Sequence, residues 1–326
     1  MLSDRIGRIN PSATLEMTSK AAELRSAGID VINLSVGEPD FPTPKNIRDA
    51  AKSAIDNGQT RYTPGGGTAN LKNAIVSKLK RDNALNYDPS EILVSCGGKH
   101  SLYNACQVLF QAGDEVIIFS PYWVSFPDFV SVTGAKPVFV TTNPETQFEP
   151  IMDDLLKKIN QRTKGIIINS PSNPTGGVWS NDAVADVLKE AEKVGAWVFS
   201  DECYEQLTYD IHFKSIQQYD LSNKRILTFQ SCSKTYSMTG WRIGYTAGHP
   251  DIIKAMGKIQ SQSTSCPNSI AQYAAIEALS GDQSAVAYMK STFKKRRDFI
   301  VDALNEIEGI NCETPGGAFY VFPCLK

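Results

Sequence analysis

One lysine lies in a segment whose neighbours are suited to binding a phosphate. Residues 231–244 read S-C-S-K-T-Y-S-M-T-G-W-R-I-G, so Lys234 is flanked by hydroxyl side chains and followed by Arg242. A lysine amine forms a Schiff base with an aldehyde cofactor, and a phosphate bound beside it would keep that aldehyde within reach. An isolated S-x-S-K is typical of a solvated loop, but G-W-R-I-G-Y predicts that Arg242 lies in a buried strand and needs an anionic partner. The pattern therefore indicates pyridoxal phosphate chemistry.

Two upstream segments supply polar groups for the cofactor ring. N-S-P-S-N-P-T-G at 169–176 and V-F-S-D-E-C-Y at 198–204 each follow an apolar run, which places Asn173 and Asp201 at or just past strand ends. A carboxylate against the pyridine nitrogen keeps it protonated, so Asp201 would let the ring accept electrons when a substrate Cα loses its proton. Asn173 and Tyr204 can donate hydrogen bonds to the ring phenolate oxygen, which lowers the pKa of the lysine imine.

The elements that must position these residues alternate along the chain. Such alternation predicts an α/β fold with a mostly parallel sheet and helices on both faces. A charged helix at 282–307 and a strand at 318–322 begin a second, smaller unit. Strands of the main sheet are expected at 92–95, 116–119, 138–141, 165–169, 197–200, 226–230 and 242–247, with helices at 101–111, 152–160, 181–194 and 251–260.

The motifs N-P-x-G, D-E-x-Y, S-x-S-K and R-x-G, in this order, resemble the class I aminotransferases, which are fold-type I pyridoxal phosphate enzymes. The chain is most similar to the bacterial aspartate aminotransferase subgroup Ib. That similarity rests on P-S-A-T (11–14), G-E-P-D-F (37–41), G-G-K (97–99) and S-P-Y-W-V (120–124), and it covers essentially the whole chain.

The resemblance implies two domains. A large domain that binds pyridoxal phosphate would span 42–281, and a small discontinuous domain would combine 1–41 with 282–326. The chain stops at Leu325-Lys326, directly after G-G-A-F-Y-V-F-P. Relatives continue to an arginine that clamps the substrate α-carboxylate, so we expect the C-terminal part of the small domain to be missing.

The resemblance also implies roles around the cofactor ring. Lys234 would carry the Schiff base and, once freed by the substrate amine, would move a proton between the substrate Cα and the C4′ carbon of the cofactor. Asp201 would hold the pyridinium, and Trp123 would stack on the ring. Asn173 and Tyr204 would hold the phenolate oxygen.

By the same resemblance, the cofactor phosphate would lie between two segments. Ser231, Ser233 and Arg242 would bind it from one side. The backbone N–H groups of Gly98 and Lys99 would bind it from the other, because they open a helix and a helix N-terminus favours anions.

Three positions concern the substrate and a partner subunit. By resemblance, the backbone of Gly37 would meet the substrate α-carboxylate, with Trp123 and Asn173 also lining the substrate site. Tyr62, in R-Y-T-P-G-G-G-T, matches the tyrosine that reaches the partner subunit's phosphate, which implies a homodimer with shared active sites; the residues alone predict a turn. Lys99 opposes the helix dipole, so we interpret its ammonium as a ligand for the distal carboxylate of an acidic substrate.

Composition agrees with a large soluble enzyme. The chain has 326 residues, is 41% hydrophobic and has a formal charge of -2, which gives no basic field for nucleic acid or an anionic membrane. No run approaches the roughly 18 apolar residues of a membrane helix, which favours a cytoplasmic location. Seven scattered cysteines without C-x-x-C indicate reduced thiols, and the three histidines, His100, His212 and His249, match no metal-ligand spacing.

The sequence therefore predicts a ping-pong transaminase. Aspartate is the first candidate for the amino donor, and 2-oxoglutarate is the first candidate for the 2-oxo acid. Prephenate, aromatic and alanine-type substrates stay open; relatives that use prephenate often carry a basic residue before P-S-A-T, where this chain has Asn10. A lyase on the same scaffold would share every cofactor residue. The aminotransferase-like half of a transcription regulator would need a DNA-binding domain, for which the N-terminus has too few residues.

Overall fold

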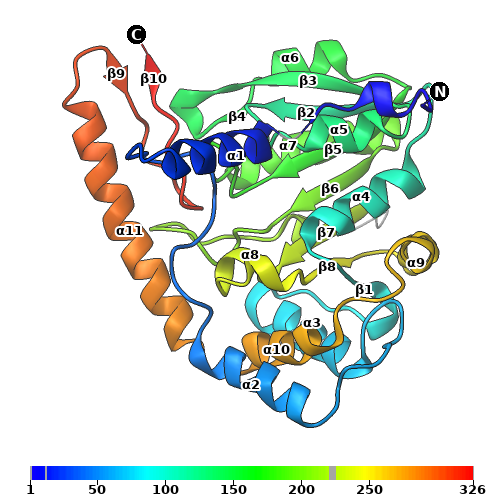
Figure 1. Cartoon of the computed structure of the whole chain (residues 1–326). Coiled ribbons are helices and arrows are strands. Elements are labelled where there is room, and N and C mark those ends of the chain that lie inside the picture. The colour runs from blue at the N-terminus through cyan, green and yellow to red at the C-terminus, as the bar shows by residue number, and fades with distance from the viewer. Residues whose placement is uncertain (1, 12, 220–224, 326) are drawn as a thin grey trace.

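The computed structural model describes residues 2–11, 13–219 and 225–325. In these residues eight strands form one sheet in the order β1-β8-β7-β6-β5-β2-β3-β4 (Figure 1). All neighbouring pairs from β3 to β7 are parallel, whereas β8 is antiparallel to β1 and β7, and β4 is antiparallel to β3. The predicted mostly parallel sheet is confirmed. Its strands are β1 (Ile92–Ser95), β2 (Glu115–Ser120), β3 (Lys136–Asn143), β4 (Glu149–Pro150), β5 (Thr163–Asn169), β6 (Trp197–Asp201), β7 (Ile226–Ser231) and β8 (Gly244–Ala247).

Helices cover both faces of the sheet, because its central strands are apolar on both sides. One face packs on α4, α5 and α9. The other packs on α6 and α7 at one end and on α2, α3 and α10 at the other. These helices are α2 (Lys45–Asp56), α3 (Ala69–Asn83), α4 (Gly98–Leu109), α5 (Phe126–Ser131), α6 (Met152–Lys158), α7 (Asn181–Val194), α9 (Pro250–Ser263) and α10 (Ser269–Ser280).

Side-chain caps set the start of several helices. Thr68 accepts a hydrogen bond from the N–H of Leu71 at the start of α3, and Ser180 accepts one from Ala183 at the start of α7. Both satisfy N–H groups that have no partner inside the helix. Helix α7 ends at Gly195, whose φ of 68° is the left-handed conformation that glycine adopts most easily.

Two predicted strands differ from the structure. The strand expected at 242–247 begins only at Gly244, because Arg242 has a φ of 56° and ends a short 3-10 helix at Thr239–Trp241. The prediction that Arg242 is a buried strand residue is therefore wrong, and its side chain is exposed. No strand is assigned at 318–322: Ala318 and Phe319 form a turn, since Ala318 has a φ of 56° and its N–H donates to the carbonyl of Leu207, and the next three residues have no regular structure.

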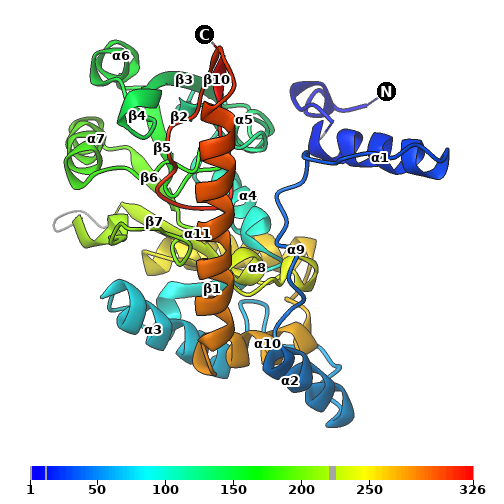
Figure 2. The ribbon, with the colours of Figure 1, turned by 90° about the vertical axis from the view of Figure 1, so that its left-hand side faces the viewer.

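Helix α11 (Ser284–Asn305) crosses in front of the sheet in Figure 2, with the C-terminal end of the described chain beyond its upper end and the N-terminal end to its right, apart from the helix. Strands β9 (Ile310–Asn311) and β10 (Cys324–Leu325) pair at the end of α11, whereas α1 (Ala13–Ser26) stands apart from it. The later residue Phe41 does reach α11. None of the described helices has both the length and the apolar composition needed to cross a bilayer.

Candidate active site

Asp201 lies at the carboxyl end of β6, where the fold buries it. Its carboxylate accepts a hydrogen bond from the backbone N–H of Cys203 at 3.2 Å. Burial raises the pKa of the carboxyl to about 7; the Cys203 N–H opposes this rise, and the neighbouring Glu202 adds to it. A buried carboxylate with such a raised pKa is suited to binding a cationic group, because a nearby positive charge would stabilise its ionised form.

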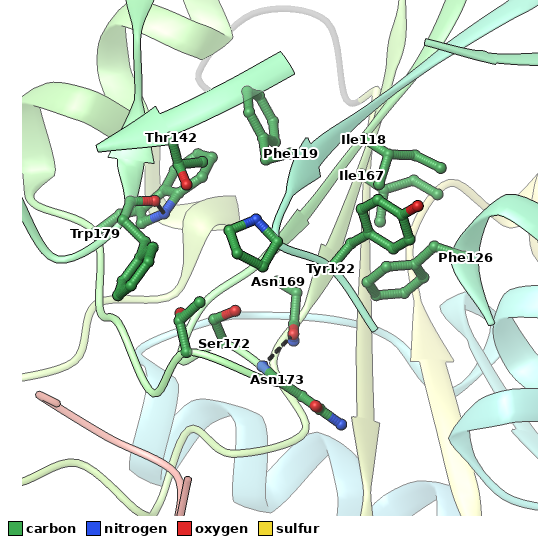
Figure 3. A pocket seen from close by; sticks show the side chains of 13 residues that line it. Ile118, Phe119, Tyr122, Phe126, Thr142, Ile167, Asn169, Ser172, Asn173 and Trp179 are labelled. Atoms are coloured by element: carbon green, nitrogen blue, oxygen red, sulfur yellow. Dashed lines mark hydrogen bonds between the residues drawn. The ribbon is translucent and has the colours of Figure 1, made fainter. Parts of the chain in front are cut away.

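Asn169 ties the end of β5 to the segment that carries Asn173. Its side-chain oxygen accepts from the N–H of Asn173 at 2.7 Å (Figure 3). Its amide donates to the carbonyl of Asp201 at 3.1 Å. The sequence alone predicted no role for Asn169, although N-S-P-S-N contains it. Asn169 and Asn173 also line a pocket together with Tyr122 and Trp179.

Tyr204 is paired with a residue that the sequence motifs did not reveal. Its hydroxyl lies 2.6 Å from the hydroxyl of Tyr320, and the two rings meet edge to face. Tyr320 also lies so close to Gly37 that a Cβ at Gly37 would overlap the tyrosine hydroxyl. Burial raises the pKa of Tyr204 well above its usual value, so its hydroxyl is protonated and able to donate. The motif G-G-A-F-Y was the available signal for Tyr320.

Lys234 lies in the short helix α8 (Cys232–Thr235), directly after β7. Its Nζ donates to the carbonyl of Gly37 at 2.5 Å. Burial lowers the pKa of the amine, while Cys203 and Glu38 oppose this effect and Arg242 adds to it. A lowered pKa increases the share of the neutral amine, which is the nucleophilic form.

Asp201 ends β6, and Lys234 follows the end of β7, the parallel neighbour of β6, so both residues lie at the carboxyl edge of the sheet. The thiol of Cys203 interacts electrostatically with both, because Asp201 raises its pKa and Lys234 lowers it, although burial is the largest cause of its shift. The structure therefore brings together the lysine and the carboxylate predicted for the two ends of one cofactor.

The hydroxyls predicted to bind phosphate are adjacent. Ser231 donates to the hydroxyl of Ser233 at 2.8 Å and accepts from the Ser233 N–H at 3.1 Å. A Cβ at Gly98 would lie 3.4 Å from the Cβ of Ser231, so the start of α4 packs against the end of β7. Hydroxyls and the free N–H groups of a helix start thus face one another.

Glycines let Arg242 reach this same place. Gly97 has a φ of 92°, and a Cβ there would overlap the guanidinium of Arg242. A Cβ at Gly244 would overlap the backbone of Gly98. Arg242 donates to the carbonyl of Thr239 at 2.7 Å and keeps further N–H groups for an anion. The segments fit a phosphate, since backbone donors, hydroxyls and a guanidinium converge where side chains are sterically excluded.

Lys99, at the start of α4, contacts the ring of Trp123. The Lys99 ammonium lies 5.0 Å from the Trp123 ring centroid, a cation–π geometry. Partial burial lowers the pKa of Lys99, Arg242 lowers it further, and Asp128 opposes both. Tyr62, in contrast, is 91% exposed, so the structure does not pack it against the other predicted site residues.

A mostly parallel sheet with a lysine, a buried carboxylate and a phosphate-sized cradle at its carboxyl edge is the arrangement of the fold-type I pyridoxal phosphate enzymes. The family model "Aminotransferase class I and II" matches residues 29–326. The chain belongs to this family and is an aminotransferase. Such enzymes use pyridoxal phosphate, so the predicted cofactor and family are confirmed.

Relatives of known name support the assignment along the whole chain. The chain is 50% identical to the aspartate/prephenate aminotransferase of Cereibacter sphaeroides, with 100% of this chain and 82% of the relative covered. It is 46% identical to the aspartate aminotransferase of Bacillus subtilis, covering 100% of this chain and 83% of the relative. The solved structure of aspartate aminotransferase from Thermus thermophilus with maleate matches with a TM-score of 0.95 and 39% identity, covering 99% of this chain and 85% of that one.

Proposed function

We propose that this aminotransferase transfers the amino group of L-aspartate to 2-oxoglutarate in two half-reactions at one site. The relatives named above act on aspartate by name, and the chain matches them over nearly its full length. The observation that carries the assignment of the site is the half-buried amine of Lys234, just after β7, beside the buried carboxylate of Asp201 at the end of the neighbouring strand β6.

Each site residue then has a chemical task. Bound pyridoxal phosphate supplies an electron-accepting ring and an aldehyde carbon. Lys234 would hold the cofactor through that carbon and, once freed by the substrate amine, would move the proton that leaves the substrate Cα. Its amine lies at the carbonyl of Gly37, the residue proposed to meet the substrate. Asp201 would keep the ring nitrogen protonated, and Asn173 and Tyr204 would donate to the ring oxygen. Trp123 would cover the ring face, and the phosphate would be held by Ser231, Ser233, Gly98 and Arg242.

The experiment that tests this site is the replacement Lys234→Ala. The wild-type chain is expected to show the Schiff-base absorbance of bound pyridoxal phosphate, and the variant should lose it together with about 10⁴-fold or more of its turnover. Lys72→Ala is a matched control, because burial also lowers the pKa of Lys72 and the residue lies outside the proposed site. A variant that retains the wild-type spectrum would show that another amine binds the cofactor.

We further propose that Lys99 selects acidic substrates. Its ammonium lies over the Trp123 ring, near enough to Arg242 and Asp128 for both to shift its pKa. An ammonium beside the ring can bind the distal carboxylate of aspartate or 2-oxoglutarate. The Thermus thermophilus aspartate aminotransferase was solved with maleate, which like aspartate is a four-carbon dicarboxylate.

This specificity is measurable as a ratio. Lys99→Ala should lower kcat/KM for aspartate by about 10- to 100-fold, the worth of a hydrogen bond between charged groups, and leave kcat/KM for alanine nearly unchanged. Lys80→Ala, an exposed lysine of α3, is the control. Equal losses for the two donors would remove Lys99 from substrate selection. The same assay with prephenate as amino acceptor tests the alternative suggested by the name of the Cereibacter relative.

We also propose a homodimer with shared active sites. We propose in addition that the chain divides into a large domain at 42–281 and a small domain formed by 1–41 and 282–326. The exposed ring of Tyr62 supports the first, because it is available to contact a second subunit. Light scattering of the wild-type chain and of Tyr62→Ala, with and without cofactor, tests it. A cytoplasmic location stays a prediction from the sequence.

A further inference from the structure

A buried cluster of charged and polar side chains lies behind the proposed cofactor site. Its members belong to α3, to the segment after β6 and to β7. Each is at most 8% exposed, which is unusual for these residue types unless they are paired. The cluster consists of Lys78, Asn83, Glu202, Glu205 and Gln230.

The register of the sheet puts this cluster on the face opposite Asp201. Asp201 of β6 pairs with Phe229 of β7, so their side chains share one face. That face is the one covered by α4, α5 and α9, since Phe229 packs there. Gln230 follows Phe229 in the strand and therefore points to the other face, toward Lys78 of α3.

Lys78 is the cation of the cluster, and all of its donors are used. Its Nζ donates to the carboxylate of Glu205 at 2.5 Å, to Asn83 at 2.8 Å and to Gln230 at 2.7 Å. Three partners satisfy the three N–H groups of an ammonium. The charge of Lys78 is thus matched directly by Glu205.

Glu202 is surrounded by donors. One carboxylate oxygen accepts from the hydroxyls of Ser200 and Ser215, both at 2.7 Å, and from the N–H of Ile216 at 3.1 Å. The other oxygen accepts from the amide of Gln230 at 3.1 Å. Burial raises the pKa of Glu202, and the hydrogen bonds from Ser215, Ser200 and Gln230 oppose this rise. The Ile216 N–H and the Gln230 amide can only donate, so the geometry of the donors suits the ionised carboxylate.

The charge of Glu202 is not cancelled by a cation among its described hydrogen-bond partners. The negative charge of Glu202 therefore affects the electrostatic potential at neighbouring titratable groups, and Asp201 is its direct neighbour in the sequence. The charged and titratable groups around the pair are Asp201, Cys203 and Glu205 on the same segment, Lys78 on α3, Cys232 and Lys234 on α8, and Tyr245 on β8.

We propose that Glu202 is a positioning residue whose buried negative charge, fixed on one face of the sheet, strengthens the hold of Asp201 on the ring-nitrogen proton on the other face. This inference rests on the proposed function, in which Asp201 binds that nitrogen. It agrees with the electrostatics of Asp201, whose pKa is raised by burial and further by Glu202. A more basic carboxylate holds a shared proton more tightly.

The test uses pyridoxal phosphate labelled with ¹⁵N in the ring and bound to the full chain. The nitrogen chemical shift, followed against pH, gives the midpoint at which the ring loses its proton. Glu202→Gln should lower this midpoint by about one pH unit, the effect of one buried neighbouring charge. Glu202→Asp keeps the charge and should stay near the wild type. Leu155→Ala, a core change on α6, should leave the midpoint unchanged, because it alters stability alone.

A second variant gives the opposite sign. Lys78→Gln removes the cation and should raise the midpoint, whereas general loosening of the fold would move both variants in the same direction. Should Glu202→Gln not fold, the Lys78→Gln result decides alone, and an unchanged or lowered midpoint overturns the proposal. A wild-type midpoint in Glu202→Gln overturns it too. If the wild-type chain does not hold the cofactor at Lys234, the failure belongs to the proposed function instead.

Discussion

The residues proposed to bind the cofactor ring and those proposed to meet the substrate are held in different ways. On the ring side, Asp201 and Asn169 are paired across β6 and β5, so the register of the central sheet sets their separation. Both follow buried strands, and the Asn169 side chain adds hydrogen bonds to the backbone around them. This side is built from sheet backbone, which changes little without global unfolding.

The substrate side is a segment without regular structure that is exposed before Gly37 and is held from Gly37 onward mainly by side-chain contacts, such as Lys234 with Gly37 and Trp241 with Thr43. Gly37 is preceded by Ile32 and Leu34, which are 86% and 91% exposed, and no regular element is assigned from Ile29 to Thr43. An exposed ion pair between Asp40 and Arg296 links this segment to α11. Segments with little burial open at low free-energy cost. The comparison indicates a preformed cofactor side and a substrate side that adjusts when substrate binds.

The largest effect is expected on the ring side, in the cofactor-free protein. Asp201 has a pKa of about 7 when folded and a usual value of 3.8, so the native state holds this proton more tightly than the unfolded chain. The protonated carboxyl of Asp201 therefore stabilises the native state fully below pH 4, and this contribution to the unfolding free energy is lost as the pH rises toward 7. Between pH 5 and pH 8 the wild type should lose about 2 to 3 kcal/mol more unfolding free energy than Asp201→Asn does.

Urea unfolding at the two pH values measures this difference. Asp154→Asn is the control, because Asp154 pairs with Lys158 on the surface and its pKa is lowered rather than raised. If the unfolding free energies of wild type and Asp201→Asn change equally between the two pH values, the Asp201 carboxyl is accessible to water in the folded protein. The cofactor side would then not be the preformed side of the site.

Arg242 sharpens the comparison, because its side chain is exposed while its surroundings are sheet backbone and glycines. If the cradle is preformed, Arg242→Ala should weaken pyridoxal phosphate binding by about 10- to 100-fold, the worth of one charged hydrogen bond. Arg242→Lys should recover only part of this loss, since an ammonium lacks the planar fork. Equilibrium dialysis gives the affinities, with the exposed Arg162→Ala as control. An unchanged affinity would place the phosphate elsewhere.

The sequence was informative wherever strands are buried on both faces. Runs such as Gly165 to Asn169 have no alternative to a central strand, and the polar residue after each run then falls at one edge of the sheet. This is why Lys234, Asp201 and Asn173 were identified as one constellation before their geometry was known. The order of the strands was not accessible, because it depends on which helices cover which face.

Sequence patterns failed where backbone conformation is set by distant contacts. Arg242 has apolar neighbours in the sequence, but its backbone is in the left-handed region, with a φ of 56°, and its guanidinium packs against Gly97, which is distant in the sequence. Likewise, residues 318–322 form an apolar and aromatic run typical of a strand, yet the N–H groups of Gly317 and Ala318 donate to the carbonyls of Gly176 and Leu207, and the chain turns there. Tyr320 reaches Tyr204 through this turn, so its place in the site could not be found from local periodicity.

The smallest effect is expected where the two sides meet, at the contact between Asp40 and Arg296. Arg296 donates to both carboxylate oxygens, at 2.7 and 3.0 Å, and its guanidinium lies 5.1 Å from the Phe41 ring centroid. Because both charges are largely exposed, Arg296→Ala should cost no more than about 1 kcal/mol of stability. Its effect should instead appear in KM for the amino donor, raised up to about 5-fold by looser placement of Gly37, with cofactor affinity unchanged.

Lys294→Ala on the same helix is the matched control, since Lys294 pairs with Asp210 and Asp298 rather than with the Gly37 segment. If Arg296→Ala also lowered the affinity for pyridoxal phosphate, the segment around Gly37 and the cofactor side of the sheet would be coupled. The distinction between a preformed cofactor side and a substrate side that adjusts would then be wrong.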